Sequence, residues 1–284
     1  IPAIAIPHSG IYLLLLIVYI LLQSLLIEQP YPERVSSHAL SLVLAFFALL
    51  AAASIRHAIG METVVRWLVP LIITGSVISA CLGMIQAIEI FSPLRFLLVN
   101  TADSLPASGN AGQSNLFSQH VFIGLLALIY LSATGCKSRL LYPAMLLMVI
   151  ALGLGSSRSV WLYFTGTIAF YYLLFAGTKQ PGYRFTIRNL GLLLISFAVI
   201  QIVLDNGLIN LSGNYRSSLA RIVNDTGFDT SATEFQNDSI GQRFALWRNA
   251  VEITRDALFF GHGTDSFASL NYLDTTRDHW IYSS

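Results

Sequence analysis

The sequence predicts an all-α, polytopic transmembrane helical bundle of about seven spans, followed by a large polar loop region that contains an amphipathic helix. Two observations favour this fold class. Of the 284 residues, 55% are hydrophobic and only 11% are charged, whereas a soluble domain has roughly 25% charged residues. The apolar residues also gather in repeated stretches, several of them close to the roughly 20 residues that a spanning helix needs. So apolar a chain cannot cover itself with a water-compatible surface, and we expect lipid to surround it.

Seven apolar stretches are candidate spans, and the fifth is short. The fifth and sixth are separated only by Gly155-Ser156-Ser157, so the pair could also be one long hairpin. We treat them as two spans because Gly153, Gly155 and the serines interrupt the apolar run next to a charged residue. The predicted spans are residues 10–27, 38–55, 67–90, 116–133, 140–155, 158–176 and 189–204.

The distribution of lysine and arginine between alternate loops predicts the orientation, because cytoplasmic loops carry an excess of both residues. One set of loops carries seven of them, which are Arg56, Arg66, Lys137, Arg139, Lys179, Arg184 and Arg188. The opposite set carries Arg34, Arg95 and Arg158. The first set is therefore expected on the cytoplasmic side, together with the N-terminus. The opposite loops and residues 205–284 are then expected to face outward, into the periplasm of a Gram-negative cell.

Residues 205–284 are the predicted periplasmic loop region, which holds ten of the fifteen acidic residues. A capping-box pattern at Ser239-Ile240-Gly241-Gln242 predicts the start of a helix there. The apolar positions that follow at helical spacing are Phe244, Trp247, Val251 and Leu258. Gly261-His262-Gly263 predicts the end of this amphipathic helix.

Composition also excludes several classes of site. The net charge of +1 argues against a nucleic-acid partner, which needs a dense basic surface. The two cysteines, Cys81 and Cys136, lie in or beside apolar runs, so no disulfide framework is expected. No cluster of His, Cys, Asp and Glu has the spacing of metal ligands, so no metal site is expected. The chain opens with Ile1 rather than Met and ends at Ser284, and we interpret it as a fragment.

Three features converge on the predicted outer face. Gly109-Asn110-Ala111-Gly112-Gln113-Ser114-Asn115 leads into the fourth span, and Ser156-Ser157-Arg158 opens the sixth. Both helix N-termini would point outward, and a helix N-terminus offers unpaired N–H groups and a partial positive charge to an anion. Arg158 adds a planar fork that binds phosphate oxygens in pairs, and Arg243 with Arg248 could close over the same place. The pattern predicts a site for a phosphorylated ligand with an apolar tail in the bilayer.

Each feature also has an alternative, purely structural interpretation. Ser114 or Asn115 could simply cap the fourth span, and the neighbouring glycines could simply shape a turn. Arg158 could be an interfacial residue whose head group reaches toward water. Arg243 and Arg248 could belong to a solvated helix face, and His262 and His279 could be ordinary loop histidines.

Three motifs together resemble a known family. The segment 109–115 resembles the "GN-x-GQ-x-N" motif of bacterial O-linked oligosaccharyltransferases, which belong to the O-antigen ligase superfamily. The run Leu154-Gly-Ser-Ser-Arg-Ser-Val-Trp161 resembles the "SR-x-x-W/G" helix start of that superfamily. Residues 242–250, followed by Gly261, Gly263 and Phe267, resemble its "R-x-x-x-W-x-x-A … G-x-G-x-x-x-F" periplasmic-loop pattern. The motifs occur in family order across residues 105–270.

The resemblance implies a glycosyltransferase of the bacterial inner membrane that needs neither metal nor another cofactor. It would move a glycan en bloc from undecaprenyl diphosphate to an acceptor hydroxyl on a protein or on the lipid A core, at the periplasmic face. By motif match, Arg158 and Arg243 would hold the diphosphate, and Gln113 with Asn115 would position substrate. Further candidates by the same match are Asn110, Trp247 and Arg248.

The resemblance also implies a loop histidine that deprotonates the acceptor, but no residue of this sequence is assigned to that role. His279 lacks the asparagine that follows the family's histidine. We therefore expect the catalytic histidine beyond Ser284, and this polypeptide alone is expected to be inactive.

Two other functions compete with ligation of a glycan to a protein or lipid. An O-antigen polymerase would use the same lipid-linked donor with a second lipid-linked glycan as acceptor, and acceptor assays would separate the two. A transporter or flippase would place charged or broken-helix sites near the middle of the membrane, often in repeated halves. Here Glu89 and Arg158 lie near span ends and no repeat is evident. Coupled uptake into vesicles would favour a transporter.

Overall fold

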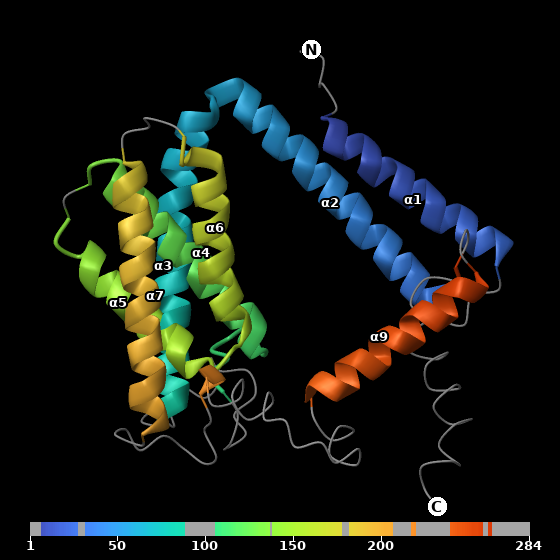
Figure 1. The fold of residues 1–284 in the computed structure, drawn as a ribbon. Helices are drawn as coiled ribbons and strands as arrows, with labels where there is room; N and C mark the ends of the chain where they lie inside the picture. Colours follow the sequence, from blue (N-terminus) through green and yellow to red (C-terminus); the bar gives the residue numbers. More distant parts are fainter. Residues whose placement is uncertain are drawn as a thin grey trace, which may run out of the picture. The chain divides into compact units, whose positions relative to one another are not determined.

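The computed structural model describes residues 7–27, 32–88, 106–136, 138–177, 182–206, 217–219, 239–257 and 261–262. These residues form helices and turns, with no strand among them (Figure 1). The helices are α1 (His8–Leu26), α2 (Pro32–Ile59), α3 (Met61–Ile88), α4 (Ser114–Ala133), α5 (Leu141–Leu154), α6 (Ser159–Phe175), α7 (Tyr183–Asp205) and α9 (Ser239–Asp256). The predicted all-α fold class is confirmed.

Each predicted span falls on one of the helices α1 to α7; α5 and α6 end within their predicted ranges, whereas α2 and α7 extend beyond theirs. The clearest case is α7, which begins at Tyr183 rather than at residue 189. Arg184 and Arg188 lie in this extension and are exposed. A prediction from hydropathy alone leaves such residues out of the span, although the helix continues through them when their charged groups can reach water. Gly182, in the left-handed region at φ 91°, is the N-cap residue of α7.

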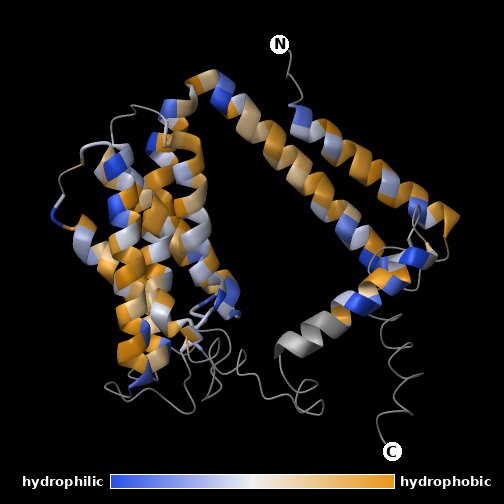
Figure 2. Cartoon of the chain, in the orientation of Figure 1, coloured by the Kyte–Doolittle hydropathy of each residue, from blue (hydrophilic) through white to orange (hydrophobic). Residues whose placement is uncertain are grey.

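Five helices are long and apolar enough to cross a membrane, namely α1, α2, α3, α4 and α7. The helices α5 and α6 are apolar but shorter. Figure 2 shows hydrophobic residues along most of the length of these helices, with hydrophilic residues gathered near their ends. Large apolar side chains also face outward, for example Leu71, Leu162 and Leu173, at 70%, 73% and 79% exposure. A surface of this kind needs lipid around it, so the chain is a multi-pass membrane protein.

The chain divides into two compact units, which are described separately. The first comprises Ile1–Val64 and Phe228–Ser284, and the second comprises Val65–Gly227. The predicted boundary at residue 204, which separates the membrane bundle from the periplasmic region, stays a prediction.

In the first unit, α1 packs against α2. The buried positions of α1 recur at Ile17, Ile20 and Gln23, which lie on one face of the helix. A turn follows α9, and its Gly261 lies beside α1, because a Cβ on this glycine would be 3.5 Å from the Gln23 amide nitrogen.

In the second unit, α4 contacts α5, α6 and α7, and α7 contacts α5 and α6. Its core consists mainly of buried side chains of these four helices, including Phe117, Phe164 and Phe197. The ring of Phe164 packs against Phe122 and Phe197, with ring centroids 5.0 and 5.8 Å apart. Helix α3 joins α4 closely where Ser76 donates its hydroxyl to the His120 carbonyl at 3.0 Å. Close approach of helices at small residues is typical of membrane bundles.

Candidate functional site

The turn before α4 is held against α3 and α5. Its glycines Gly109 and Gly112 have φ angles of 54° and 70°, so the predicted role of both glycines in shaping a turn is confirmed. The side-chain oxygen of Gln86, on α3, accepts hydrogen bonds from the Ser108 and Gly109 N–H groups, both at 2.8 Å. The Ala107 N–H donates to the Leu154 carbonyl at 3.1 Å, which fixes the turn to the end of α5. Gln86 was not identified from the sequence as a residue of this site.

The Phe117 ring explains why three glycines meet at this end of the second unit. A Cβ on Gly83 would lie 2.4 Å from the ring, and Cβ atoms on Gly109 and Gly155 would lie 3.2 and 3.3 Å from it. These glycines come from α3, from the turn before α4 and from the turn between α5 and α6. The fully buried phenylalanine therefore packs both turns against the bundle. Close packing against its ring thus explains the glycines at positions 109 and 155 of the two motifs.

The turn between α5 and α6 contains a strained residue. Ser156 is fully buried and has a φ of 48°, a left-handed conformation that usually falls to glycine at the C-terminal end of a helix. It lets the chain leave α5 at Leu154 and start α6 at Ser159, so the two short helices are separate. Such strain costs about 1–3 kcal/mol and is common at functional sites.

A hydrogen bond joins the two predicted outer turns. The Ser157 hydroxyl donates to the Asn115 side-chain oxygen at 2.7 Å, across 42 residues of sequence. The alternative interpretation of Asn115 as a helix cap is wrong, because the N-cap position of α4 is Gln113. Asn115 lies in the first turn of α4, and its side chain accepts a bond from the turn before α6 instead. The first two predicted features therefore lie side by side (Figure 1).

Arg158 occupies the N-cap position of α6 and is half-buried. No side-chain hydrogen bond from the N-cap residue closes either α6 or α4. The first N–H groups of a helix have no acceptor within the helix, so two helix N-termini with their partial positive charge lie next to this arginine. Gln113 and Asn110 are exposed on the neighbouring turn, and Asn110 accepts a hydrogen bond from the Ser79 hydroxyl at 3.4 Å.

A buried amide network, which was not predicted, extends this region to residues 217–219. Gln201 of α7 is fully buried, and its oxygen accepts bonds from the Ser218 N–H at 2.8 Å and the Ser218 hydroxyl at 2.6 Å. Its nitrogen donates to the Gly153 carbonyl at 3.1 Å. The Trp161 indole N–H donates to the Ser218 hydroxyl at 3.1 Å, one helical turn after Arg158. The network fixes the start of the predicted periplasmic region beside the Arg158 turn.

The third predicted feature, the arginines of α9, lies in the first unit. Helix α9 begins at Ser239 as predicted but ends at Asp256, before the predicted Gly261-His262-Gly263. The Ala257 N–H bonds back to the Thr254 carbonyl at 3.3 Å, a three-residue spacing that tightens the last turn. The Arg243 side chain lies outside the described residues. The predicted meeting of Arg158 with Arg243 stays a prediction.

The other candidates on α9, Trp247 and Arg248, lie on the surface of the helix. Trp247 is exposed, and Arg248 forms an ion pair with Glu252 at 3.1 Å on the helix surface. Such an exposed pair one turn apart contributes about 0.3–0.5 kcal/mol, which agrees with a solvated helix face. His262 lies close to the same helix, where its Nε2 is 2.9 Å from the Ile253 carbonyl. Because a carbonyl only accepts, the proton sits on Nε2 and the ring closes the turn after α9. His279 lies outside the described residues.

No group of three His, Cys, Asp or Glu side chains in the described part of the chain is placed to hold a metal ion. The groups at the Arg158 turn are a cation, amides, hydroxyls and helix N-termini. These groups bind and stabilise negative charge, and none of them is a strong base.

Comparison with known proteins identifies the family. The family model described as O-antigen ligase matches residues 143–282. This range includes Arg158 and the arginines of α9, whereas the turn before α4 lies outside it. No curated protein and no solved structure matches the chain. The match agrees with the resemblance carried by the motifs around Arg158 and Trp247, and the chain belongs to the O-antigen ligase superfamily of membrane glycosyltransferases.

Proposed function

We propose that the protein moves a glycan en bloc from undecaprenyl diphosphate to an acceptor hydroxyl, with the Arg158 turn holding the diphosphate. The acceptor is a protein serine or threonine or a sugar of the lipid A core. The reaction takes place at the periplasmic face of the inner membrane, with the N-terminus in the cytoplasm and residues 205–284 in the periplasm.

One observation carries the proposal, namely the hydrogen bond between Ser157 and Asn115. It holds the N-terminus of α4 against the turn that bears Arg158. A diphosphate at this place would meet a guanidinium group and the partial positive charge of two helix N-termini. Gln113 is exposed on the same turn and supplies a further amide donor. The apolar outer surface of the bundle leaves the polyprenyl tail in lipid.

The proposed step is a displacement at the sugar C1 atom. The bond from C1 to the diphosphate oxygen breaks, a bond from the acceptor oxygen to C1 forms, and undecaprenyl diphosphate leaves with the electron pair. Negative charge grows on the leaving diphosphate, and fixed cationic and N–H groups stabilise it in a poorly hydrated site. The proton of the acceptor hydroxyl passes to a general base, which would contribute roughly 10²–10⁴-fold. We assign this base to no described residue, and Arg243 is the proposed second ligand of the diphosphate.

The proposal is tested by transfer assays on membranes that contain the full-length protein, with a lipid-linked glycan as donor. Arg158→Gln is expected to lower the transfer rate about 10²–10³-fold, the usual effect of removing one group that stabilises developing charge. Arg56→Gln removes the same charge from the exposed last turn of α2 and is expected to leave transfer unchanged. Parallel arms with a protein, a lipid A core and a second lipid-linked glycan as acceptor identify the product. Wild-type transfer by Arg158→Gln would refute the proposed role.

A further inference from the structure

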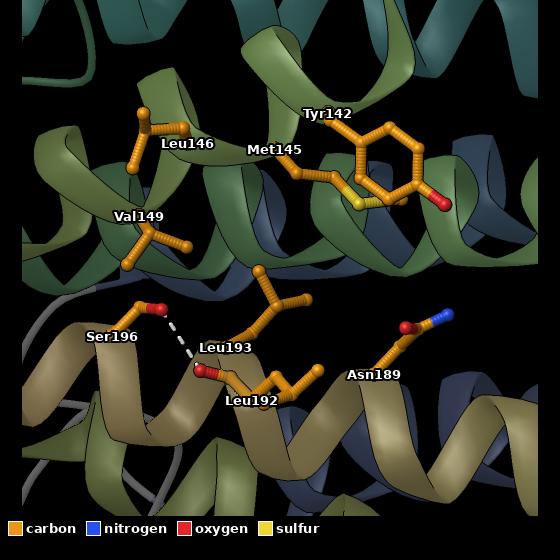
Figure 3. A pocket seen from close by; sticks show the side chains of 8 residues that line it. All are labelled: Tyr142, Met145, Leu146, Val149, Asn189, Leu192, Leu193 and Ser196. Atoms are coloured by element: carbon orange, nitrogen blue, oxygen red, sulfur yellow. Dashed lines mark hydrogen bonds between the residues drawn. The ribbon is translucent and has the colours of Figure 1, made fainter.

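A groove lies between residues 142–149 of α5 and 189–196 of α7, so it is centred slightly nearer the first residue of each helix. Its walls are mainly apolar and come from Tyr142, Met145 and Val149 on α5 and from Asn189, Leu192 and Ser196 on α7. The cavity volume is about 160 Å³. Figure 3 shows the side chains of the two helices facing each other across this space, with the Asn189 amide directed into it. The residues proposed for glycan transfer lie at the opposite ends of these helices.

One polar group in the groove lacks an acceptor. Asn189 is only 9% exposed, and its amide nitrogen has no hydrogen-bond partner among the described residues. The other small polar group, the Ser196 hydroxyl, donates to the Leu192 carbonyl of its own helix at 2.9 Å, as Figure 3 shows. A buried amide donor is normally paired. The groove therefore offers one buried hydrogen-bond donor, with the exposed Tyr142 hydroxyl at its edge, to an occupant whose remaining surface is hydrocarbon.

Positive charge flanks the end of the groove that is lined by Tyr142 and Asn189. Arg188 precedes Asn189, lies one turn before Leu192, and has its guanidinium carbon 5.6 Å from the Phe185 ring centroid. Arg184 lies one turn further out on α7, and both arginines are exposed. Arg139 comes just before α5, at the same end of the pair. A partner with an anionic head, one acceptor below it and an apolar tail fits this sequence of groups.

The spacing along α7 matches the layers of a bilayer. Arg184 and Asn189 are separated by about 7.5 Å along the helix axis, at 1.5 Å per residue. The interfacial layer on each side of the hydrocarbon core is roughly 5–8 Å thick. Arg184 would thus lie at phosphate depth when Asn189 lies at the depth of the ester carbonyls. Arg188 lies only about 1.5 Å from Asn189 along the axis, and its long side chain can extend toward the same phosphate depth. We propose that this groove binds an anionic phospholipid of the leaflet on the arginine-rich side, with its phosphate on the arginines, an ester carbonyl on Asn189 and one acyl chain along the groove. The site is independent of glycan transfer.

The test measures lipid binding to the full chain, delipidated in detergent, by native mass spectrometry with phosphatidylglycerol or phosphatidylcholine. The wild-type protein is expected to bind phosphatidylglycerol at least 5-fold more tightly, since one basic residue near an anionic lipid gives about this factor. Asn189→Leu is expected to weaken phosphatidylglycerol binding about 2- to 10-fold, the range of one net hydrogen bond. Arg188→Gln is expected to weaken it about 5-fold.

The matched control is Asn206→Leu, the same exchange on the same helix at an exposed amide that bonds only the Ile202 carbonyl in the described structure. It is expected to leave lipid binding unchanged. Equal affinity for the two lipids, or unchanged phosphatidylglycerol binding by Asn189→Leu, would overturn the proposal.

Thermal unfolding distinguishes a lipid from another helix as the occupant. Without lipid, Asn189→Leu removes a donor that lacks an acceptor, so its melting temperature is expected to equal or exceed that of the wild type. Added phosphatidylglycerol is then expected to raise the melting temperature of the wild type more than that of the variant. A lower melting temperature of Asn189→Leu without lipid would show that the amide already bonds to protein, and the proposal would be wrong.

Discussion

Replacing Gln201 with leucine removes the buried amide that joins α7, the end of α5 and residues 217–219. The Gln201 oxygen accepts the Ser218 N–H at 2.8 Å and the Ser218 hydroxyl at 2.6 Å, and its nitrogen donates to the Gly153 carbonyl at 3.1 Å. The Gly153 carbonyl keeps a second donor, the Ser156 N–H at 3.1 Å. Leucine is of similar size, so little space is lost or gained. The cost therefore falls mainly on Ser218.

The size of this cost follows from the groups left without a partner. A buried N–H without an acceptor costs about 1–3 kcal/mol. The Ser218 hydroxyl can rotate and still accepts from the Trp161 indole at 3.1 Å, so its contribution is smaller. At about 1.4 kcal/mol per factor of ten, 1–3 kcal/mol raises the population of the detached segment by roughly 5- to 150-fold.

Hydrogen–deuterium exchange of the peptide that contains residues 217–219 measures this population. Exchange at Ser218 is expected to accelerate by the same factor in Gln201→Leu. Asn206→Leu removes an exposed amide from the end of the same helix, so its effect is expected to stay within about 0.5 kcal/mol. Unchanged exchange in Gln201→Leu, or equal acceleration in both variants, would refute the claim that Gln201 anchors this segment.

Two further predictions concern packing and orientation. Gly124→Ala would place a Cβ 2.2 Å from the Ser76 Cβ, which cannot rotate away, so thermal unfolding in detergent is expected to show a loss of about 1–3 kcal/mol. Gly191→Ala, whose Cβ would meet nothing within 4 Å, is expected to be neutral or to stabilise by up to about 1 kcal/mol, and an equal loss in both variants would exclude the clash as the cause. An impermeant maleimide is expected to label the exposed Cys136 only after the inner membrane is permeabilised, because the positive-inside rule predicts that this end of α4 faces the cytoplasm. Labelling of Cys136 in intact cells, checked against Cys136→Ser, would reverse the orientation and place Arg158 in the cytoplasm.

The sequence alone predicted the membrane-spanning helices, because a helix surrounded by lipid must consist mostly of apolar residues. A run of about 20 apolar residues predicts a spanning helix without knowledge of its neighbours. The helix ends were less predictable, as α7 shows at Tyr183, because charged residues such as Arg184 continue the helix while lowering its hydropathy. The end of α9 at Asp256 depended on a tight last turn rather than on the glycines that followed.

The candidate site was predicted in its charges but not in its contacts. Arg158 could be identified because a charged residue between two apolar runs is unusual. The bond from Ser157 to Asn115 connects residues 42 positions apart and depends on how α4 packs against α5 and α6. Gln86 and Gln201 did carry a signal, since each is an amide inside or beside an apolar stretch, and amides often join helices in membranes. Their partners, the backbone groups near Ser108 and Ser218, could only come from the tertiary structure.

The role of Arg158 in holding the donor is tested most directly by the affinity for undecaprenyl diphosphate. The full chain in nanodiscs would be titrated with this lipid, with Arg158→Gln beside the wild type and Arg56→Gln, at an exposed arginine in the last turn of α2, as the control for charge. A charged hydrogen bond contributes about 1.5–3 kcal/mol, so Arg158→Gln is expected to raise the Kd roughly 10- to 150-fold while Arg56→Gln leaves it unchanged. Equal Kd values for Arg158→Gln and the wild type would contradict a diphosphate site at this turn.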